Sequence, residues 1–168
     1  MNELVRASAV VAGLWTVAAA PAASPNPPAG FESVSINVLR AMAIRPVYRV
    51  VVTSDGKVDF EGIAYTKVSG HRASQLVPTD VEALAAVVRA SDFFALAKTY
   101  RRAASSCHFW VTDGLRYEIS VTAHGHRDTV SFNSGFGCNN DLADAIRILA
   151  VKVAAISGAI DLAGGREL

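Results

Sequence analysis

The sequence has little of what the common enzyme and metal chemistries require. It holds two cysteines among 168 residues and no Cys-x-x-Cys pair, which argues against a disulfide-dense miniprotein and a zinc-ribbon spacing. It also lacks a phosphate-binding Gly-x-x-x-x-Gly-Lys-Ser/Thr loop, a Gly-x-Ser-x-Gly nucleophile elbow and a His-Glu-x-x-His metal motif. We therefore predict no catalytic residue, no metal ligand and no cofactor.

Charge of one sign is also scarce. Sixteen basic and fifteen acidic residues give a formal net charge of +1. A nucleic-acid partner is not expected, because binding to phosphates calls for a basic excess. Hydrophobic residues make up 51% of the chain, which suits one domain with a real core. We expect a single domain over residues 32–160 and a flexible tail over residues 161–168.

Residues 1–31 differ in composition from the rest. Arg6 precedes an uncharged apolar run over residues 7–20, and small residues follow. This layout is typical of a secretory signal peptide, and a run of about 14 residues is shorter than the roughly 20 of a membrane span. We assign residues 1–22 to a signal peptide, with an amphipathic or buried helix as the alternative, and residues 23–31 to a Pro-rich linker. The mature chain would be exported, to the periplasm or outside the cell, with no stable membrane span.

Alternation of apolar and polar residues predicts the first strands. Residues 33–40 alternate strictly, which indicates a half-buried strand. Residues 47–62 are typical of a hairpin with a three-residue turn that ends at a left-handed Gly56. This turn pairs Val52 with Val58 and places the apolar side chains of both strands on one face.

Helices are predicted where the apolar spacing changes. A further strand is expected over residues 63–68, and residues 77–100 then repeat apolar positions at helical spacing. Thr79 and Glu82 are expected to form a capping box at its start. A last helix begins near Asn140.

A second hairpin completes the pattern. Residues 116–133 are expected to fold around a two-residue turn, His124-Gly125, which pairs Ile119 with Val130. Hairpins imply antiparallel pairing. The predicted fold class is α+β, with an antiparallel sheet built from two hairpins and an N-terminal strand, and with helices packed on one face.

The segment CHFWVTDG before this hairpin groups aromatic and polar side chains. His108, Trp110 and Asp113, together with His124, are candidates for a binding edge. The alternative is that the aromatic residues cap the core beneath a long loop. His124 and His126 form a His-x-His pair, but zinc needs three or four convergent ligands, so no metal site is predicted.

The two cysteines are candidates for a crosslink. Cys107 and Cys138 lie beyond the open end of the second hairpin, offset by a few residues. Loops on each side can bring the α-carbons within the roughly 4.4–6.8 Å that a disulfide needs, and export would supply an oxidising compartment. We predict a Cys107–Cys138 disulfide. The alternative is a pair of buried free thiols.

The order of these motifs resembles the bacterial domain of unknown function 6438 over about residues 33–155. That family has a strand ending in Arg, a Pro-Val-Tyr strand, a Gly turn, a Phe-x-Gly and a helix with a Phe-Phe-x-Leu end and a Tyr. The matching positions are Arg40, Pro46, Val47, Tyr48, Gly56, Phe60, Gly62, Phe93, Phe94, Leu96 and Tyr100. Many members carry a paired-cysteine loop before Pro-Val-Tyr, whereas this chain has AMAIR. The resemblance implies an exported protein and supplies no activity or catalytic residue.

Together these features predict an exported protein that works by binding rather than by catalysis. Its partner would be an unknown protein or small ligand of the cell envelope. The contact would be made by the outer sheet face or by the loops at residues 101–114 and 134–139. Two alternatives stay open: an enzyme that uses His108, Asp113 or His124, and a structural protein of the envelope.

Overall fold

The structure of the chain is a computed structural model, and it describes residues 30–39, 44–105, 116–133 and 140–165. The predicted signal peptide lies outside these ranges. In chain order, the elements are β1 (Ser33–Leu39), β2 (Val47–Thr53), β3 (Lys57–Ala64), β4 (Gly70–Gln75), α1 (Pro78–Ser91), α2 (Phe93–Ser105), β5 (Arg116–Ala123), β6 (His126–Asn133), α3 (Asn140–Ile156) and α4 (Ala159–Ala163).

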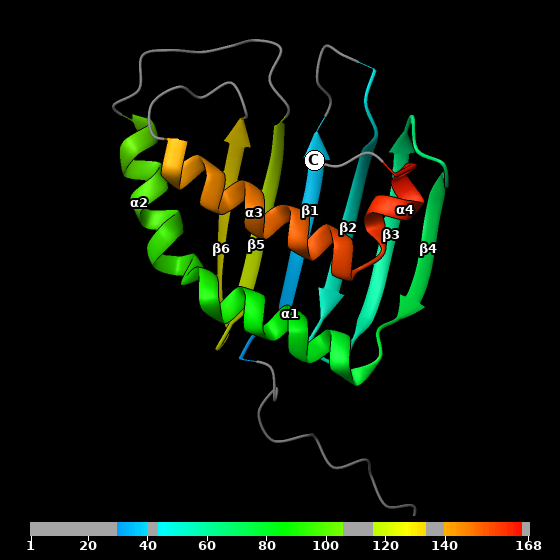
Figure 1. Ribbon diagram of the computed structural model, residues 1–168, viewed down its shortest axis with the longest axis horizontal. Coiled ribbons are helices and arrows are strands. Elements are labelled where there is room, and N and C mark those ends of the chain that lie inside the picture. The colour runs from blue at the N-terminus through cyan, green and yellow to red at the C-terminus, as the bar shows by residue number, and fades with distance from the viewer. Residues whose placement is uncertain (1–29, 40–43, 106–115, 134–139, 166–168) are drawn as a thin grey trace, which may run out of the picture.

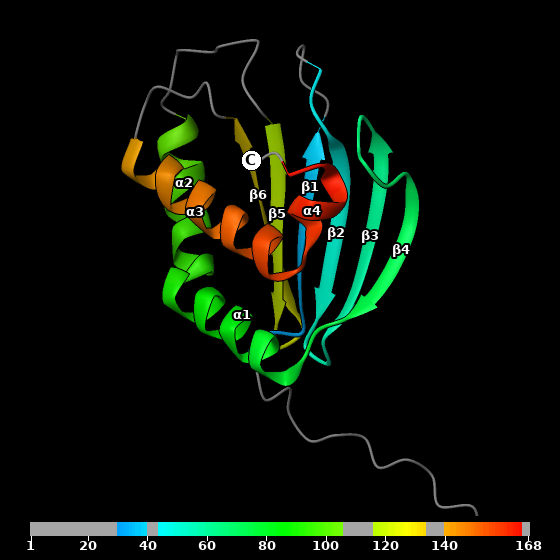
Figure 2. The same ribbon diagram turned by 45° about the vertical axis from the view of Figure 1, so that its right-hand side comes forward.

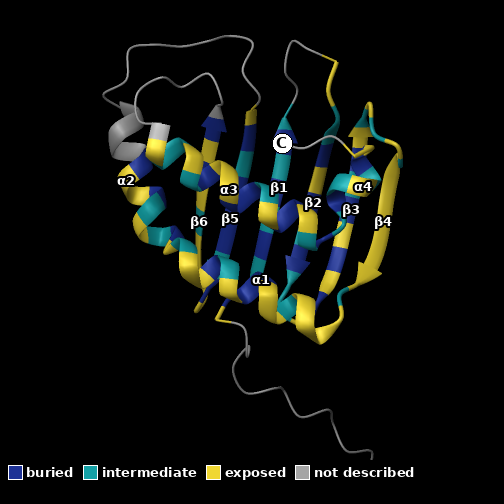
Figure 3. Cartoon of the chain, in the orientation of Figure 1, coloured by how far each residue is buried: buried dark blue, intermediate teal, exposed yellow. Residues whose placement is uncertain are grey.

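The strands form one open antiparallel sheet in the order β4-β3-β2-β1-β5-β6 (Figure 1). This confirms the α+β class: two hairpins flank the N-terminal strand, and β4 is added at one edge. The helices lie on one face of the sheet, as Figures 1 and 2 show from two directions. Buried residues gather between the two layers (Figure 3).

β1 occupies the centre of the sheet because it pairs with one strand of each hairpin. Every second residue of β1 is buried. Ile36, for example, is fully buried and pairs with Val50 of β2 and Ile119 of β5. The polar residues between the buried ones point to the other face. The half-buried strand predicted from strict alternation is confirmed.

The first hairpin turn has the predicted register. Gly56 has a φ of +84°, and Val52 pairs with Val58. The turn also packs closely against the segment that leads into α1. A β-carbon at Gly56 would lie 2.7 Å from the Gln75 side-chain nitrogen and 3.0 Å from the Val81 side chain. Glycine is therefore required here both for its left-handed backbone and for this close approach.

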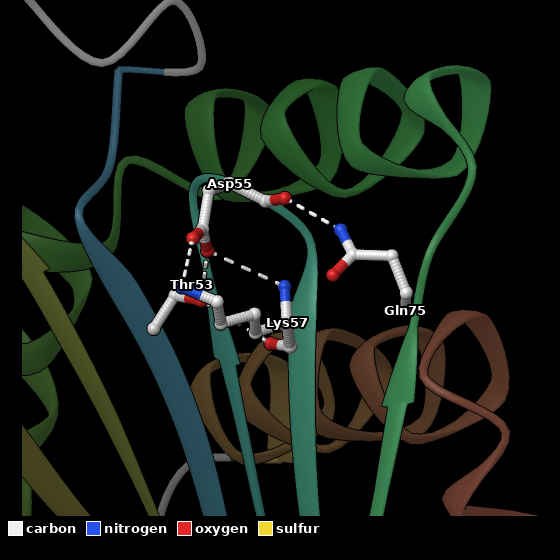
Figure 4. Close-up of polar contacts among 4 residues, drawn as sticks. All are labelled: Thr53, Asp55, Lys57 and Gln75. Carbon is white, nitrogen blue, oxygen red and sulfur yellow. Dashed lines mark hydrogen bonds and ion pairs between the residues drawn. The ribbon is translucent and has the colours of Figure 1, made fainter. Parts of the chain in front are cut away.

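Polar side chains hold the same turn closed (Figure 4). Lys57 Nζ lies 2.7 Å from Asp55 Oδ2, and the Thr53 hydroxyl donates to Asp55 Oδ1. These hydrogen bonds, from Lys57 first and then Thr53, lower the pKa of Asp55 from 3.8 to about 2. The Gln75 amide donates to the Asp55 carbonyl oxygen at 2.7 Å. The end of β4 is thus tied to the turn between β2 and β3.

The strand predicted over residues 63–68 is wrong. β3 continues to Ala64, and the chain then turns through Tyr65, which has a φ of +56°, before β4 begins at Gly70. The apolar letters that suggested the strand do not mark a buried face, since Ile63 and Tyr65 are 55% and 56% exposed. The real strand, β4, is exposed at all of its residues and carries no hydrophobic pattern.

Gly62 allows the chain to make this turn. A β-carbon at Gly62 would collide with the Val68 carbonyl oxygen. The Val68 N–H in turn donates to the Leu162 carbonyl oxygen of α4 at 3.0 Å.

Both ends of the described domain are packed into the core: Ala163 is 2% exposed and Phe31 is fully buried. The packed domain therefore starts one residue before the predicted boundary, and it includes residues that had been assigned to a flexible tail.

The predicted capping box of Thr79 and Glu82 is wrong. α1 begins at Pro78, and its N-cap residue, Val77, makes no side-chain hydrogen bond. Proline suits the first helical position because it has no N–H that would need a partner. Thr79 consequently lies inside the first turn of the helix instead of at its cap. The Glu82 carboxylate forms an ion pair with Arg89 at 2.8 Å.

We expect Gly56→Ala to lower the free energy of unfolding more than Gly125→Ala does. Both glycines have positive φ, so each alanine should incur a strain of roughly 1–2 kcal/mol. Only Gly56 has neighbours that an added β-carbon would meet; at Gly125 nothing lies within 4 Å. Chemical denaturation of both variants measures the difference. Equal losses would show that the close approach at Gly56 contributes nothing.

The lowered pKa of Asp55 predicts a pH-dependent contribution to stability. A depressed carboxyl pKa stabilises the folded state above about pH 4, and this contribution is lost as the pH falls toward the folded value of about 2. Asp55→Asn should therefore be less stable than wild type at about pH 5, and the difference should vanish near pH 2. Because the group is exposed, added salt should shrink the difference. A difference that is independent of pH would contradict the ion pair.

Candidate functional site

Only one of the side chains predicted for the binding edge or the crosslink is described by the structure, and it is His124. It lies in the turn between β5 and β6. Arg116, the first residue of β5, lies at the opposite end of the hairpin from this turn. With a rise of about 3.3 Å per residue, Arg116 is about 23 Å from Ala123, the last residue of the strand. The disulfide and the rest of the binding edge stay predictions, because these residues lie outside the described ranges: Cys107, His108, Trp110, Asp113 and Cys138.

The second hairpin confirms the two-residue turn. His124 and Gly125 have φ values of +52° and +70°, which a tight turn of this type requires of both central residues. Ile119 pairs with Val130 as predicted. The Gly125 N–H donates to the Glu32 carboxylate at 2.6 Å. The turn is thereby joined to the residue that precedes β1.

His124 contributes to a pocket of about 220 Å³ between this turn and the junction of α1 and α2. Arg89 of α1 and Asp92, which lies between α1 and α2, line it, and Arg89 is already paired with Glu82. The remaining lining is mostly apolar: Gly30, Val88, Phe93, Phe94, Val121 and Ala123. The pocket is smaller than the roughly 300–1,000 Å³ of typical small-ligand sites.

His126 packs against an aromatic ring. The centroid of its imidazole lies 5.4 Å from that of Phe94, at an interplanar angle of 42°. Within the part of the chain that the structure describes, no three His, Cys, Asp or Glu side chains are arranged to hold a metal ion. The His-x-His pair thus has no third described ligand beside it.

The face of the sheet that no described helix covers carries polar side chains on every strand. Directly paired residues point to the same side of a sheet, and one line of pairs crosses all six strands. We call this line the charged row. In sheet order it consists of His71, Glu61, Arg49, Asn37, Glu118 and Ser131.

Charges alternate along the charged row. Arg49 is exposed near its middle, with Glu61 on one side and, beyond Asn37, Glu118 on the other. Two contacts join neighbours within the row: His71 Nε2 lies 3.7 Å from Glu61 Oε1, and the Ser131 hydroxyl donates to Glu118 at 3.2 Å. The result is an open polar strip with a cation between two anions.

The next line of pairs is also polar on four of the six strands, with Ala73 on β4 and Val51 on β2 as its apolar members. Asp59 lies in it on β3, and its carboxylate is 3.5 Å from His71 Nδ1. Ser120 of β5 is 6% exposed, and its hydroxyl is 2.8 Å from that of Thr129. The Arg127 guanidinium also reaches the Ser120 hydroxyl, at 3.3 Å. On the described strands, polar side chains therefore predominate on this part of the face.

The helix-covered side of the sheet contains two buried tyrosines with no acid–base role near neutral pH. Burial raises the pKa of Tyr48 to about 12, and burial raises the pKa of Tyr117 as well. Neither hydroxyl has a hydrogen-bond partner among the described residues. Tyr48 stacks on Phe60, and Tyr117 lies against Phe132, with ring centroids 5.5 Å and 4.7 Å apart. Both phenols stay protonated and serve as parts of the core.

The fold defines a small α+β domain in which no described helix covers one face of the sheet. Residues 42–156, more than half of the chain, match the domain of unknown function DUF6438, and the chain belongs to this family. The comparison with curated proteins gave no match. No helix in the described ranges combines the length and the apolar character that crossing a membrane demands.

Sequence reasoning named the outer sheet face as a contact surface without naming its residues. Arg49 and Glu61 could have been paired, because the predicted register of the first hairpin implies it. His71 could not have been placed, because the strand that carries it was expected at residues 63–68. The pocket at His124 depends on where α1 gives way to α2, and no local pattern brings that junction to the second hairpin.

Proposed function

We propose that this chain is an exported binding domain of the cell envelope and that its uncovered sheet face contacts a partner protein. The charged row carries this proposal. Sheet pairing brings residues from six strands into one open line of alternating charge, with Arg49 between Glu61 and Glu118. Complementary charges of this kind set the register and the choice of a partner.

The shape of the face favours a protein over a small molecule. Six strands have five spacings of about 4.8 Å each, so the sheet is about 24 Å wide. Small ligands bind in concave sites that enclose most of their surface, whereas an open face of this width suits a protein interface.

Export is supported by the sequence of the amino end. An apolar run over residues 7–20 is followed by small residues and then by three prolines within residues 24–30. Phe31 is the first residue of the described core. Removal of residues 1–22 would consequently take no side chain from that core.

Charge reversal in the charged row should abolish partner capture. We expect immobilised Arg49→Glu protein to lose the partner that wild type retains from an envelope extract, because the cation between Glu61 and Glu118 would become an anion and would repel the partner group that Arg49 attracts. Lys98→Glu makes the same charge change on an exposed residue of α2 and should retain the partner. Mass spectrometry of the eluates measures capture, and thermal melting checks the fold. Equal capture by wild type and Arg49→Glu would overturn the assignment of this face.

Export predicts a processed and oxidised chain. The intact mass of the protein recovered from its own cell envelope should correspond to a chain without residues 1–22. The same sample, denatured without reductant, should titrate no free thiol if Cys107 and Cys138 are joined. A full-length mass from the cytoplasm would contradict export. Free thiols on an exported chain would contradict only the disulfide.

A further inference from the structure

The turn between β2 and β3 contains a chemically reactive pair of residues, Asp55 followed by Gly56. An aspartate side chain can react with the backbone nitrogen of the next residue. Glycine makes this easiest, because it has no side chain to shield that nitrogen or to restrict the backbone. The Asp55 side chain is 54% exposed, so water reaches it.

The reaction has two steps. The Gly56 amide nitrogen gives up its proton and forms a bond to Asp55 Cγ, and the protonated carboxyl group loses its hydroxyl as water. The product is a five-membered succinimide ring. Water then opens the ring at one of its two carbonyl groups. One opening restores aspartate, and the other leaves the main chain running through the side-chain carbonyl, which is isoaspartate of unchanged mass.

The conformation of the folded turn opposes closure of this ring. The Gly56 N–H donates to the Thr53 carbonyl oxygen at 2.9 Å, and the φ of Asp55 is not positive. These features define a type I turn, in which the ψ of Asp55 is about 0°. At this ψ the Gly56 nitrogen eclipses the backbone nitrogen of Asp55. The ring requires it to eclipse the Asp55 β-carbon instead, so the peptide group must rotate before the ring can form.

Hydrogen bonds on both sides of this peptide group resist the rotation. The Gln75 amide donates to the Asp55 carbonyl oxygen at 2.7 Å, and the Thr53 carbonyl oxygen accepts the Gly56 N–H. Figure 4 shows the Asp55 carbonyl group directed at Gln75, on the side away from the Asp55 carboxylate. Rotation about the bond between the α-carbon and the carbonyl carbon of Asp55 would break both hydrogen bonds.

The Asp55 carboxylate is held as well. Lys57 Nζ lies 2.7 Å from Oδ2, and Oδ1 accepts from the Thr53 hydroxyl and from the Lys57 N–H at 3.4 Å. A carboxylate with both oxygens engaged is not free to turn toward the Gly56 nitrogen. With a pKa of about 2, the group also stays ionised in neutral and mildly acidic water, whereas ring formation consumes the protonated form.

We propose that Asp55-Gly56 is a latent site of isoaspartate formation, which the contacts of Gln75, Thr53 and Lys57 prevent while the domain is folded. Isoaspartate would add one methylene group to the main chain inside the turn. It would also displace the carbonyl oxygen to which Gln75 of β4 donates. Transient opening of the turn would then leave a permanent covalent change at the point where the end of β4 is attached.

Isoaspartate formation in the full chain tests the proposal. Wild type is incubated in mildly acidic buffer, folded in one sample and denatured with guanidinium chloride in the other. Peptide mapping, with fragmentation that distinguishes isoaspartate from aspartate, gives the rate at residue 55. The folded chain should react at least about tenfold more slowly, because two hydrogen bonds must break before the ring can close. Equal rates in the two samples would overturn the proposal.

Three variants test which contacts protect the site. Gln75→Glu removes the amide donor with little change of shape, and Lys57→Met removes the ammonium group. Both should form isoaspartate several-fold faster than folded wild type. Lys57→Arg keeps the cation and should react like wild type. Thermal melting confirms that each variant is folded during the incubation. Wild-type rates in folded Gln75→Glu and folded Lys57→Met would contradict the protection, and the comparison of folded with denatured wild type decides without any variant.

Discussion

The pairing of β1 on both of its edges is the constraint on which the rest of the fold depends. β1 joins the hairpin of β2 and β3 to the hairpin of β5 and β6, and the buried apolar residues of all five strands point to one side. A slip of one residue in either pairing would turn the apolar side chains of a whole hairpin toward the uncovered face. Because both registers agree, the sheet offers a single apolar face, and the helices pack there.

β4 is held in a different way from the other strands. Its side chains are exposed, so apolar burial contributes little to its position. Instead it is fixed by backbone pairing with β3, by the bond from Gln75 to the Asp55 carbonyl oxygen and by the close fit at Gly56. Among the described strands, β4 pairs with β3 alone and forms one edge of the sheet.

The one-sided packing of the helices also accounts for where binding is proposed. The buried apolar side chains of the sheet pack on the helix-covered face, and the opposite face carries the charged row across all six strands. The chain belongs to a family of unknown function, so its surface is the most direct guide to its activity. On the described strands, the sheet face that no described helix covers is polar and charged.

By itself the sequence determined the features that local patterns encode. Strict alternation specified β1, and apolar matching across each turn specified the registers at Gly56 and at His124. Only the tertiary structure decided the position of β4, the start of α1 at Pro78 and the junction of helices beside His124. The physical reason is that these features depend on contacts between distant segments. β4 has no apolar period to reveal it, and its place is set by residues of another hairpin.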